Sequence, residues 1–395
     1  MLYKKSMSIK ALIQKETKRQ KRVINLIPSE NYVSKDVLAA LGSPLTNKYA
    51  EGKSHRRYYF GNEITDQIED RTKELIYKIF KISPKNYGVN VQSYSGSIAN
   101  LAAYIGSVGL GAKILAMSLE HGGHLTHGHK VSLTGKLFKF EHYGVGRDGY
   151  IDYSVVTKLA KKFKPQLIVC GASAYPRKLD FKKFRQIANS VGALLMADIS
   201  HIAGLVVGGV HTSPFPYADI VTSTTHKTLR GPRGAFIISN LRTSHVLRLS
   251  ERIDKAIFPG LQGGPQLHTI AAMGVAFEEA LKPDFKKYAK QVVANAKALA
   301  AELRRLGLEI ITGGTDNHLM LVDMTLLGLT GKQAGERLER AGIIVNKNMI
   351  PYDSRKPWDP SGIRLGTPAV TTQGMKEKDM VRIARKIKTI LTKNK

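Results

Sequence analysis

Cysteine, tryptophan and acidic residues are scarce in this 395-residue chain, which has one cysteine and one tryptophan. A single thiol cannot form an internal disulfide. Cys170 lies in an apolar run, 167–170, which predicts a core thiol in a reducing compartment and therefore a cytoplasmic protein. No apolar run reaches the length of about 20 residues that a bilayer requires, and the lysine-rich start lacks a signal core. We therefore expect neither a membrane span nor secretion.

Acidic residues are half as frequent as basic ones. The chain has 61 Lys plus Arg against 31 Asp plus Glu, a net charge of +30, with much of the excess in 4–22 and 382–395. Such an excess predicts attraction to polyanions and says nothing about the fold. A nucleic-acid-binding protein would need a binding motif or an aromatic-rich basic groove, and aromatics are only 7%. Nucleic acid is therefore expected to bind weakly and non-specifically, if at all.

Several motifs of common enzyme classes are missing. No Gly-x-Gly-x-x-Gly follows a strand and no Walker-type loop is present, which argues against a dinucleotide or ATP enzyme. His121, His124, His127 and His129 are separated by glycines and have no nearby Cys or carboxylate beyond Glu120. We therefore expect no metal site.

Helical patterns alternate with short apolar strands in the central part of the chain, and a smaller mixed unit follows. This alternation predicts a mostly parallel sheet covered by helices. We expect an N-terminal arm over 1–45, which begins as a basic helix and continues as an extended stretch to about residue 40, a large domain over 46–280 and a small α+β domain over 281–395. The expected strands include 113–117, 167–170, 193–197, 219–222, 319–323 and 343–345, and the expected helices include 64–80, 271–280, 285–306, 331–341 and one from 374.

Lys227 is the most informative residue. It follows the apolar run 219–222 and enters a Gly/Pro-rich loop, where burial and the cations Arg230 and Arg233 would lower its pKa and make it a Schiff-base nucleophile. Asp198 ends another apolar run. An acid that keeps the ring nitrogen protonated and an amine that holds the aldehyde are what pyridoxal phosphate (PLP) requires. An isolated lysine at a strand end more often only caps a loop, but the paired Asp198 favours the cofactor.

Ser95, Gly96 and Ser97 precede a helical run. Small residues at a helix N-terminus present free amides and the positive end of the helix dipole to a phosphate, although they are also ordinary helix caps. With a lysine and an aspartate that already indicate PLP, the sequence favours a phosphate site here.

The sequence resembles the serine hydroxymethyltransferase family. The blocks that carry the resemblance occur in the family's order between about residues 23 and 375: 26–31 (LIPSEN), 47–52 (NKYAEG), 121–128 (HGGHLTHG), 224–234 (TTHKTLRGPRG), 313–318 (GGTDNH) and 361–369 (SGIRLGTPA). The resemblance implies the aspartate-aminotransferase-like fold type I of PLP-dependent transferases, with a seven-stranded, mostly parallel sheet in the large domain.

The resemblance also implies an activity, the reversible conversion of L-serine and tetrahydrofolate to glycine and 5,10-methylenetetrahydrofolate. A modified pterin in place of tetrahydrofolate is left open. The alternative is a threonine-aldolase-like PLP lyase, which would share Lys227 and Asp198 but need no folate. Gly263 and Gly264 resemble the loop that reaches the phosphate from the partner subunit, which implies a homodimer and allows a dimer of dimers.

The roles of individual residues follow from the resemblance alone. For the cofactor, His124 would stack on the ring, and His201 and Ser173 would bind the side of its phenolic oxygen. Arg364 would clamp the substrate carboxylate, Glu51 would assist proton transfer, and His226 is linked to reaction specificity. The remaining positions would bind substrate, namely Ser29, Tyr49 and Tyr59, or border the folate beside Glu51, namely Tyr58, Leu119, Gly123, Leu125 and Asn348.

Three positions depart from the family's pattern. Pro28 replaces a usual Ala, Ala235 replaces a second Gly, and Tyr94 replaces a His or Asn. None of them carries an assigned chemical role.

Overall fold

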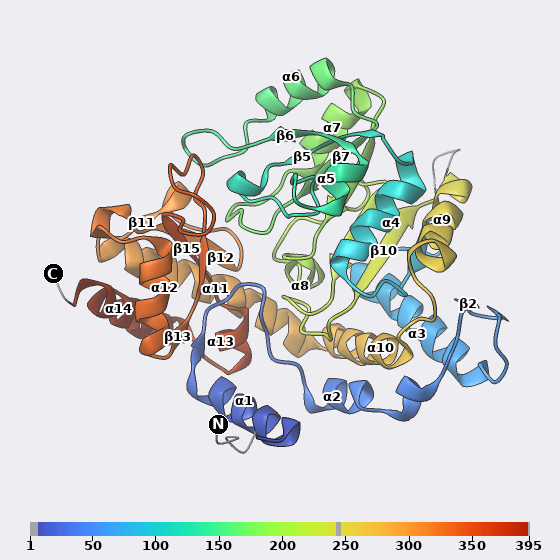
Figure 1. Cartoon of the computed structure of the whole chain (residues 1–395), viewed down its shortest axis with the longest axis horizontal. Coiled ribbons are helices and arrows are strands. Elements are labelled where there is room, and N and C mark those ends of the chain that lie inside the picture. The colour runs from blue at the N-terminus through green and yellow to red at the C-terminus, as the bar shows by residue number, and fades with distance from the viewer. Residues whose placement is uncertain (1–6, 242–245, 394–395) are drawn as a thin grey trace, which may run out of the picture.

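A seven-stranded sheet forms the centre of the larger of two α/β units (Figure 1). The computed structural model describes residues 7–241 and 246–393. The strands lie in the order β4 (Tyr87–Asn90), β10 (Ala235–Asn240), β9 (Ile220–Thr224), β8 (Leu194–Asp198), β7 (Leu167–Gly171), β5 (Lys113–Met117) and β6 (Lys139–Tyr143). Only β10 runs antiparallel to its neighbours. The expected mostly parallel sheet is confirmed.

Both faces of this sheet are buried, as the continuous apolar strands predict. Alternate residues of each strand enter two separate cores. One core lies under α4 (Gly96–Val108), α9 (Val246–Lys255) and the turn η3 (Ala256–Leu261). The other lies under the helices α3 (Glu63–Phe80), α6 (Tyr153–Phe163), α7 (Phe181–Ser190), α8 (Ala203–Val207) and α10 (Leu267–Leu281).

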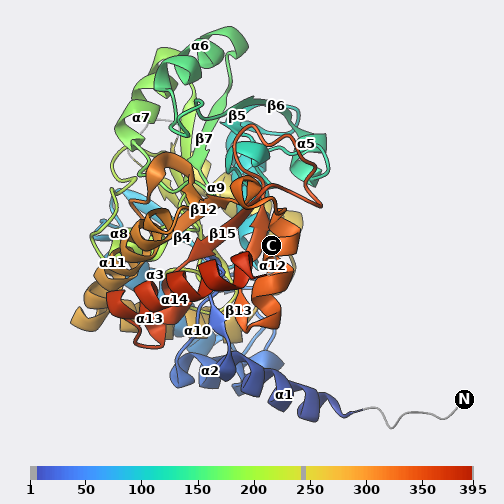
Figure 2. The same ribbon diagram turned by 90° about the vertical axis from the view of Figure 1, so that its left-hand side faces the viewer.

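The smaller unit is an antiparallel sheet with helices on one side. Its strands are β11 (Glu309–Ile310), β12 (Leu319–Asp323), β15 (Gly362–Gly366) and β14 (Asn346–Asn348). A third core packs them against α12 (Gly331–Arg340) and α14 (Glu377–Thr392), and α13 (Pro368–Thr372) follows β15. These helices lie in the left half of Figure 1, and in Figure 2 they face the viewer.

Helix α11 (Pro283–Arg305) joins the two units. Its first half, from Phe285 to Val292, packs in the core of the large unit, and its second half, from Ala296 to Leu303, packs in the core of the small one. We propose a domain boundary just before this helix, near residue 281.

The N-terminal segment runs along the small unit before it joins the large one. After α1 (Ile9–Arg22), strand β1 (Ile24–Asn25) pairs in parallel with β13 (Ile343–Ile344). A helix, α2 (Lys35–Leu41), then forms where the sequence suggested an extended stretch, because Ser34 caps it and Val37 buries its side chain. A short hairpin follows, β2 (Gly52–Lys53) and β3 (Arg56–Arg57). Lys4 and Lys5 of the basic arm, and the last two residues, 394–395, lie outside the described residues. No helix in the described ranges is both long and apolar enough to cross a membrane.

Candidate active site

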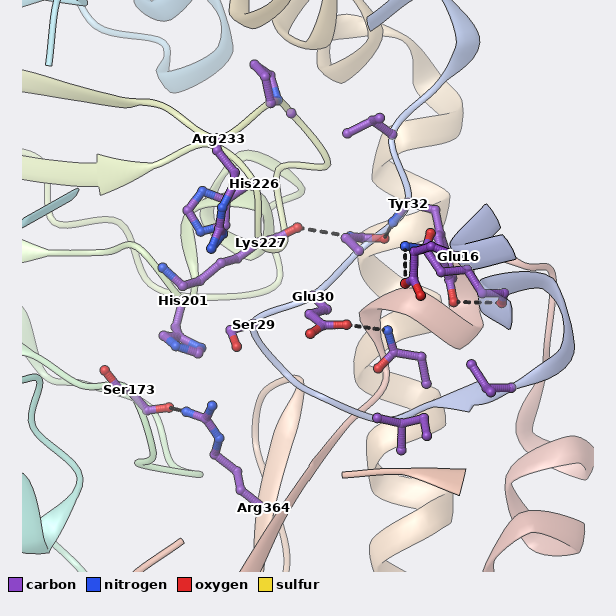
Figure 3. Close-up of a pocket in the computed structure, with 18 of the residues that line it drawn as sticks. Glu16, Ser29, Glu30, Tyr32, Ser173, His201, His226, Lys227, Arg233 and Arg364 are labelled. Atoms are coloured by element: carbon purple, nitrogen blue, oxygen red, sulfur yellow. Dashed lines mark hydrogen bonds between the residues drawn. The ribbon is translucent and has the colours of Figure 1, made fainter. Parts of the chain in front are cut away.

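Lys227 lies in the loop after β9, and its side chain enters a cavity of about 750 Å³ (Figure 3). The Nζ atom donates a 2.8 Å hydrogen bond to the Thr224 hydroxyl. Burial lowers the pKa of this amine to about 8; Asp198 opposes the shift, and Arg364 and Arg233 add to it. About a tenth of the amine is therefore unprotonated at pH 7, far more than in an ordinary lysine, and the unprotonated amine is the form that acts as a nucleophile.

Arg230 does not lie beside the amine as the sequence suggested. Its guanidinium faces Glu279, at 4.0 Å, and lies 4.7 Å from the centre of the Tyr288 ring. The residue has a left-handed backbone with φ of 58°, which turns its side chain toward α10 and α11. Arg233 and Arg364 are the cations that act on Lys227.

The backbone of this loop is held by Asn31, a residue to which the sequence gave no role. The Asn31 amide donates to the Lys227 carbonyl at 2.9 Å and to the Tyr288 hydroxyl at 2.7 Å. Its oxygen accepts a hydrogen bond of 2.7 Å from Thr372 of α13. One side chain from the N-terminal segment thus joins the lysine loop, α11 and α13.

Asp198 ends β8, at the same edge of the parallel sheet as the lysine loop. One carboxylate oxygen accepts from Asn100 at 2.9 Å and from His127 at 3.2 Å, and the other accepts from the Ser200 amide at 3.0 Å. Burial by itself raises the pKa of this carboxyl, but His127, followed by Ser200 and Asn100, outweighs burial and holds the pKa well below its usual range. Asp198 is therefore a buried anion at neutral pH.

The first turn of α4 lies beside Lys227 in a second cavity of about 350 Å³, where Ser95, Gly96 and Ser97 all line the wall. The Ser95 hydroxyl caps the helix by accepting from the Ile98 amide. A Cβ on Gly96 would lie 2.6 Å from the methyl carbon of Thr224, so only glycine lets the helix start approach β9 this closely. The N-terminus of α4, where the free amides and the positive end of the helix dipole are, therefore forms part of the cavity wall.

His124 lines both cavities. Its Nδ1 atom lies 2.7 Å from the Thr126 hydroxyl, and this hydrogen bond fixes the orientation of the His124 ring. Burial is the largest cause that lowers the pKa of His124 to about 4, so the ring is neutral. A neutral aromatic face beside Lys227 is compatible with the expected stacking role.

His201 and His226 lie on either side of Lys227 in Figure 3. The Nδ1 atom of His201 lies 3.2 Å from Nε2 of His318, and burial is the main cause that lowers the pKa of His201 well below its usual value. His226 has a pKa lowered to about 3, chiefly by burial and then by Lys227 and Arg233. Its Nδ1 atom is buried without a hydrogen-bond partner among the described residues.

Arg364 rises from β15 into the same cavity (Figure 3). Its Nε donates to Asn346 at 3.0 Å and its Nη1 to the Ser173 carbonyl at 2.6 Å. Within the described part of the chain, no carboxylate lies in ion-pair distance of this guanidinium. Burial lowers its pKa to about 10. A partly buried arginine with free donors and no acidic partner in the described ranges is suited to an anionic ligand. Ser29 lines the cavity from the N-terminal segment.

A second group of expected residues lies together but outside the wall of the Lys227 cavities. Glu51 approaches Gly263, whose Cβ position would lie 3.2 Å from a Glu51 carboxylate oxygen, and the Tyr49 ring approaches Gly264 in the same way, at 3.3 Å. Tyr49 and Tyr59 pack edge to face with 4.9 Å between ring centres.

The hairpin that carries this group is anchored by a buried ion-pair cluster. Arg57 pairs with Asp66 and Glu69, each at 2.8 Å, and donates to the carbonyls of Ala50 and Gly52 on either side of Glu51. Aromatic side chains just after the hairpin are exposed to solvent, among them Tyr58, which is 81% exposed, and Phe60, which is 98% exposed.

Tyr94, one of the departures from the family's pattern, connects the two groups. It lines the cavity beside Lys227, and its hydroxyl donates a 2.6 Å hydrogen bond to the Gly264 carbonyl. Its amide donates to the Gln262 side chain at 2.9 Å. The glycine loop is therefore tied to the start of α4.

The expected folate-edge residues line neither of the two cavities beside Lys227. Leu119 lies in a short turn, Leu125 is 45% exposed, and Asn348 ends β14. Gly123 is tightly packed, since a Cβ would lie 2.2 Å from the Met117 carbonyl. Their contact with a pterin stays a prediction.

The fold and the site together define a class of enzyme. A seven-stranded sheet, an amine with a lowered pKa, a buried aspartate and a helix N-terminus around one cavity fit PLP, and the fold is fold type I of the PLP-dependent enzymes.

The chain belongs to the serine hydroxymethyltransferase family, whose model matches residues 2–387. It is 55% identical over 382 residues to a serine hydroxymethyltransferase of Methanosarcina barkeri (strain Fusaro / DSM 804), a match that covers 96% of this chain and 90% of the relative. The expected family, fold class and enzyme class, a PLP-dependent glycine hydroxymethyltransferase, are confirmed.

Proposed function

We propose that the Lys227 cavity is the site where this chain converts L-serine and tetrahydrofolate to glycine and 5,10-methylenetetrahydrofolate. The observation that carries the proposal is the position of Arg364. It is a partly buried cation without an acidic partner in the described ranges, and it shares a cavity with Lys227, whose amine has a pKa of about 8. An amino acid offers the carboxylate that Arg364 lacks.

PLP, when bound, supplies an electron sink for the bonds around the substrate α-carbon. Lys227 would hold its aldehyde, and the amides at the start of α4 would bind its phosphate. Asp198, kept anionic by His127, would hold the proton of the ring nitrogen. The remaining cofactor contacts are proposed for the ring face, at His124, and for the phenolic oxygen, at His201 and Ser173.

Arg364 and Ser29 would orient the substrate. Two of the five guanidinium N–H groups are already used by Asn346 and the Ser173 carbonyl, and three remain for a carboxylate. A bidentate contact fixes the rotation of the amino acid, and therefore decides which bond of its α-carbon aligns with the electron sink.

Glu51 would move protons around the transferred carbon, and we propose that it acts in the site of the other subunit of a homodimer. Glu51, Tyr49 and Tyr59 lie with the Gly263–Gly264 loop, outside the wall of the cavity of their own subunit. Exposed apolar side chains on the hairpin and on α1, where Ile9 is 72% exposed, support a contact with a second copy.

A mixing experiment tests whether Glu51 acts in the site of the neighbouring subunit. Glu51→Gln and Lys227→Ala subunits are combined in equal amounts and allowed to exchange. If Glu51 serves the neighbouring site, each mixed dimer has one intact site and the mixture shows about a quarter of wild-type turnover. If Glu51 serves its own site, the mixture is as inactive as its parents.

The carrier is tested by glycine formation from serine with tetrahydrofolate, with a modified pterin and with neither. Turnover that requires one carrier supports the transferase and identifies the carrier. Equal cleavage without a carrier would instead support a lyase. A cytoplasmic location is proposed on the basis of Cys170, which is buried and free.

A further inference from the structure

A small cavity borders His201, and Lys227 is not part of its wall. Its volume is about 10 Å³, close to the minimum that holds one water molecule. Besides apolar groups, its wall is formed by polar residues from the loop between β7 and α7, from the end of β8, from the loop after α8 and from the segment before β12, namely Tyr175, Arg177, Asp198, His201, His211, Asn317 and His318.

Two nitrogen atoms on this wall have no partner. Nδ1 of His318 and Nε2 of His211 are buried and form no hydrogen bond with any described residue. The other polar side chains are occupied: Arg177 binds Asp316 and Thr312, and Asn317 donates to the Tyr175 carbonyl. A buried polar atom without a partner costs about 1–3 kcal/mol, so two such atoms on residues that line one cavity point to a bound molecule that joins them.

The tautomer of His211 can be derived from its contacts. Its Nδ1 lies 3.0 Å from the Thr212 carbonyl and 3.2 Å from the Thr212 hydroxyl. The carbonyl only accepts, and the hydroxyl proton is used on the Leu179 carbonyl. Burial lowers the pKa of His211, so the ring is neutral. Its single proton is therefore on Nδ1, and Nε2 is an acceptor.

We propose that one buried water donates its two hydrogens to Nε2 of His211 and Nδ1 of His318, and that His211 and His318 are thereby positioning residues for His201. With Nδ1 of His318 accepting, its proton is on Nε2, where it is donated to Nδ1 of His201 across 3.2 Å. His201 is then protonated on Nε2, the atom left for the active-site cavity. The chain of three histidines fixes His201 as a hydrogen-bond donor.

The direction of this chain rests on the proposed function in one respect, that His201 faces an oxygen that accepts, the phenolic oxygen of PLP. The His201 and His318 rings are nearly parallel, with 28° between their planes and 5.4 Å between centres. Burial lowers the pKa of His318 to about 3, with contributions from Arg364, His211 and Lys227. All three rings are thus neutral and each carries one proton, so the position of one proton sets the next.

The test is the protonation state of each ring nitrogen in holoenzyme labelled with ¹⁵N-histidine, assigned by single substitutions. We expect the proton on Nδ1 of His211 and on Nε2 of His318 and His201. A crystal structure at high resolution should show one water within hydrogen-bond distance of both orphan nitrogens. A His318 protonated on Nδ1, or the two nitrogens in contact with no water between them, would overturn the proposal.

Two variants separate positioning from structure. His211→Phe keeps an aromatic ring beside Phe181 but removes the acceptor, and should change the tautomer ratio of His318 about 2- to 10-fold, the effect of one neutral hydrogen bond. His211→Gln retains an acceptor and should keep the wild-type ratio. Equal ratios in both variants would refute the relay. Glycine formation by the wild-type enzyme tests the proposed function separately, because it does not depend on these ratios.

Discussion

Replacing Arg364 tests the energetic basis of the site most directly. Burial lowers the pKa of this guanidinium from 12.5 to about 10, which corresponds to roughly 3 kcal/mol of unfavourable burial in the ligand-free protein. A bound carboxylate recovers that energy. Two hydrogen bonds between charged groups contribute about 1.5–3 kcal/mol each, so Arg364→Ala should weaken glycine and serine binding by roughly 10²- to 10⁴-fold.

The assay is equilibrium titration of holoenzyme with glycine, followed by the visible absorbance of the cofactor. Arg364→Lys is the matched control, because it keeps the positive charge and loses the planar fork. It should lose about half of the binding free energy that Arg364 contributes. Both variants should retain PLP, since no proposed cofactor contact comes from Arg364. Glycine affinity within about threefold of wild type in Arg364→Ala, the scatter expected of a surface substitution, would refute the assignment.

Four further outcomes are expected. Lys227→Ala should abolish turnover and the borohydride-reducible link to PLP, and a link that persisted would place the aldehyde on another amine. Because burial lowers the pKa of Lys227 to about 8, the rate at which apoenzyme captures PLP should rise with pH and level off above about 8; a rate that still climbed steeply at pH 10 would contradict the shift. Glu51→Gln should bind serine normally and suppress carrier-dependent turnover, and serine binding lost together with turnover would be the wrong result. Neutralising the lysines of the arm over 4–22 should weaken any RNA binding and leave turnover with a monoglutamyl carrier nearly unchanged, whereas RNA affinity that survives high salt would indicate specific recognition.

Several strands could be predicted because buried strands leave a strong local signal, but β4, β6 and β10 of the large sheet were not named. The runs at 113–117 and 319–323 coincide with β5 and β12. The meeting of Lys227 with Asp198 was also predictable, since the carboxyl ends of parallel strands share one edge of the sheet. The short helix α2 was missed because its capping serine and single buried valine give too weak a pattern.

The hydrogen-bond partners of the catalytic groups were harder to predict from the sequence. Asn100 is one of several polar residues on α4, and nothing in the sequence distinguishes the one that reaches Asp198 from 98 positions away. His127 was weighed only as a metal ligand, because spacing within a glycine-rich loop does not reveal where a ring points. The roles of Asn31 and His318 depend on contacts between segments far apart in the chain, which neither periodicity nor a local motif encodes.

The contacts of Asn31 have a consequence for how the enzyme matures during its synthesis. The lysine loop is held by a side chain near the start of the chain, and that side chain is held in turn by Thr372, which follows it by 341 residues. Domains fold in the order in which the ribosome delivers them, so the large sheet can form while the loop that carries Lys227 still lacks its support. A nascent chain should therefore fold its large sheet before it can bind PLP. PLP binding should occur only after the whole chain has been synthesised and folded.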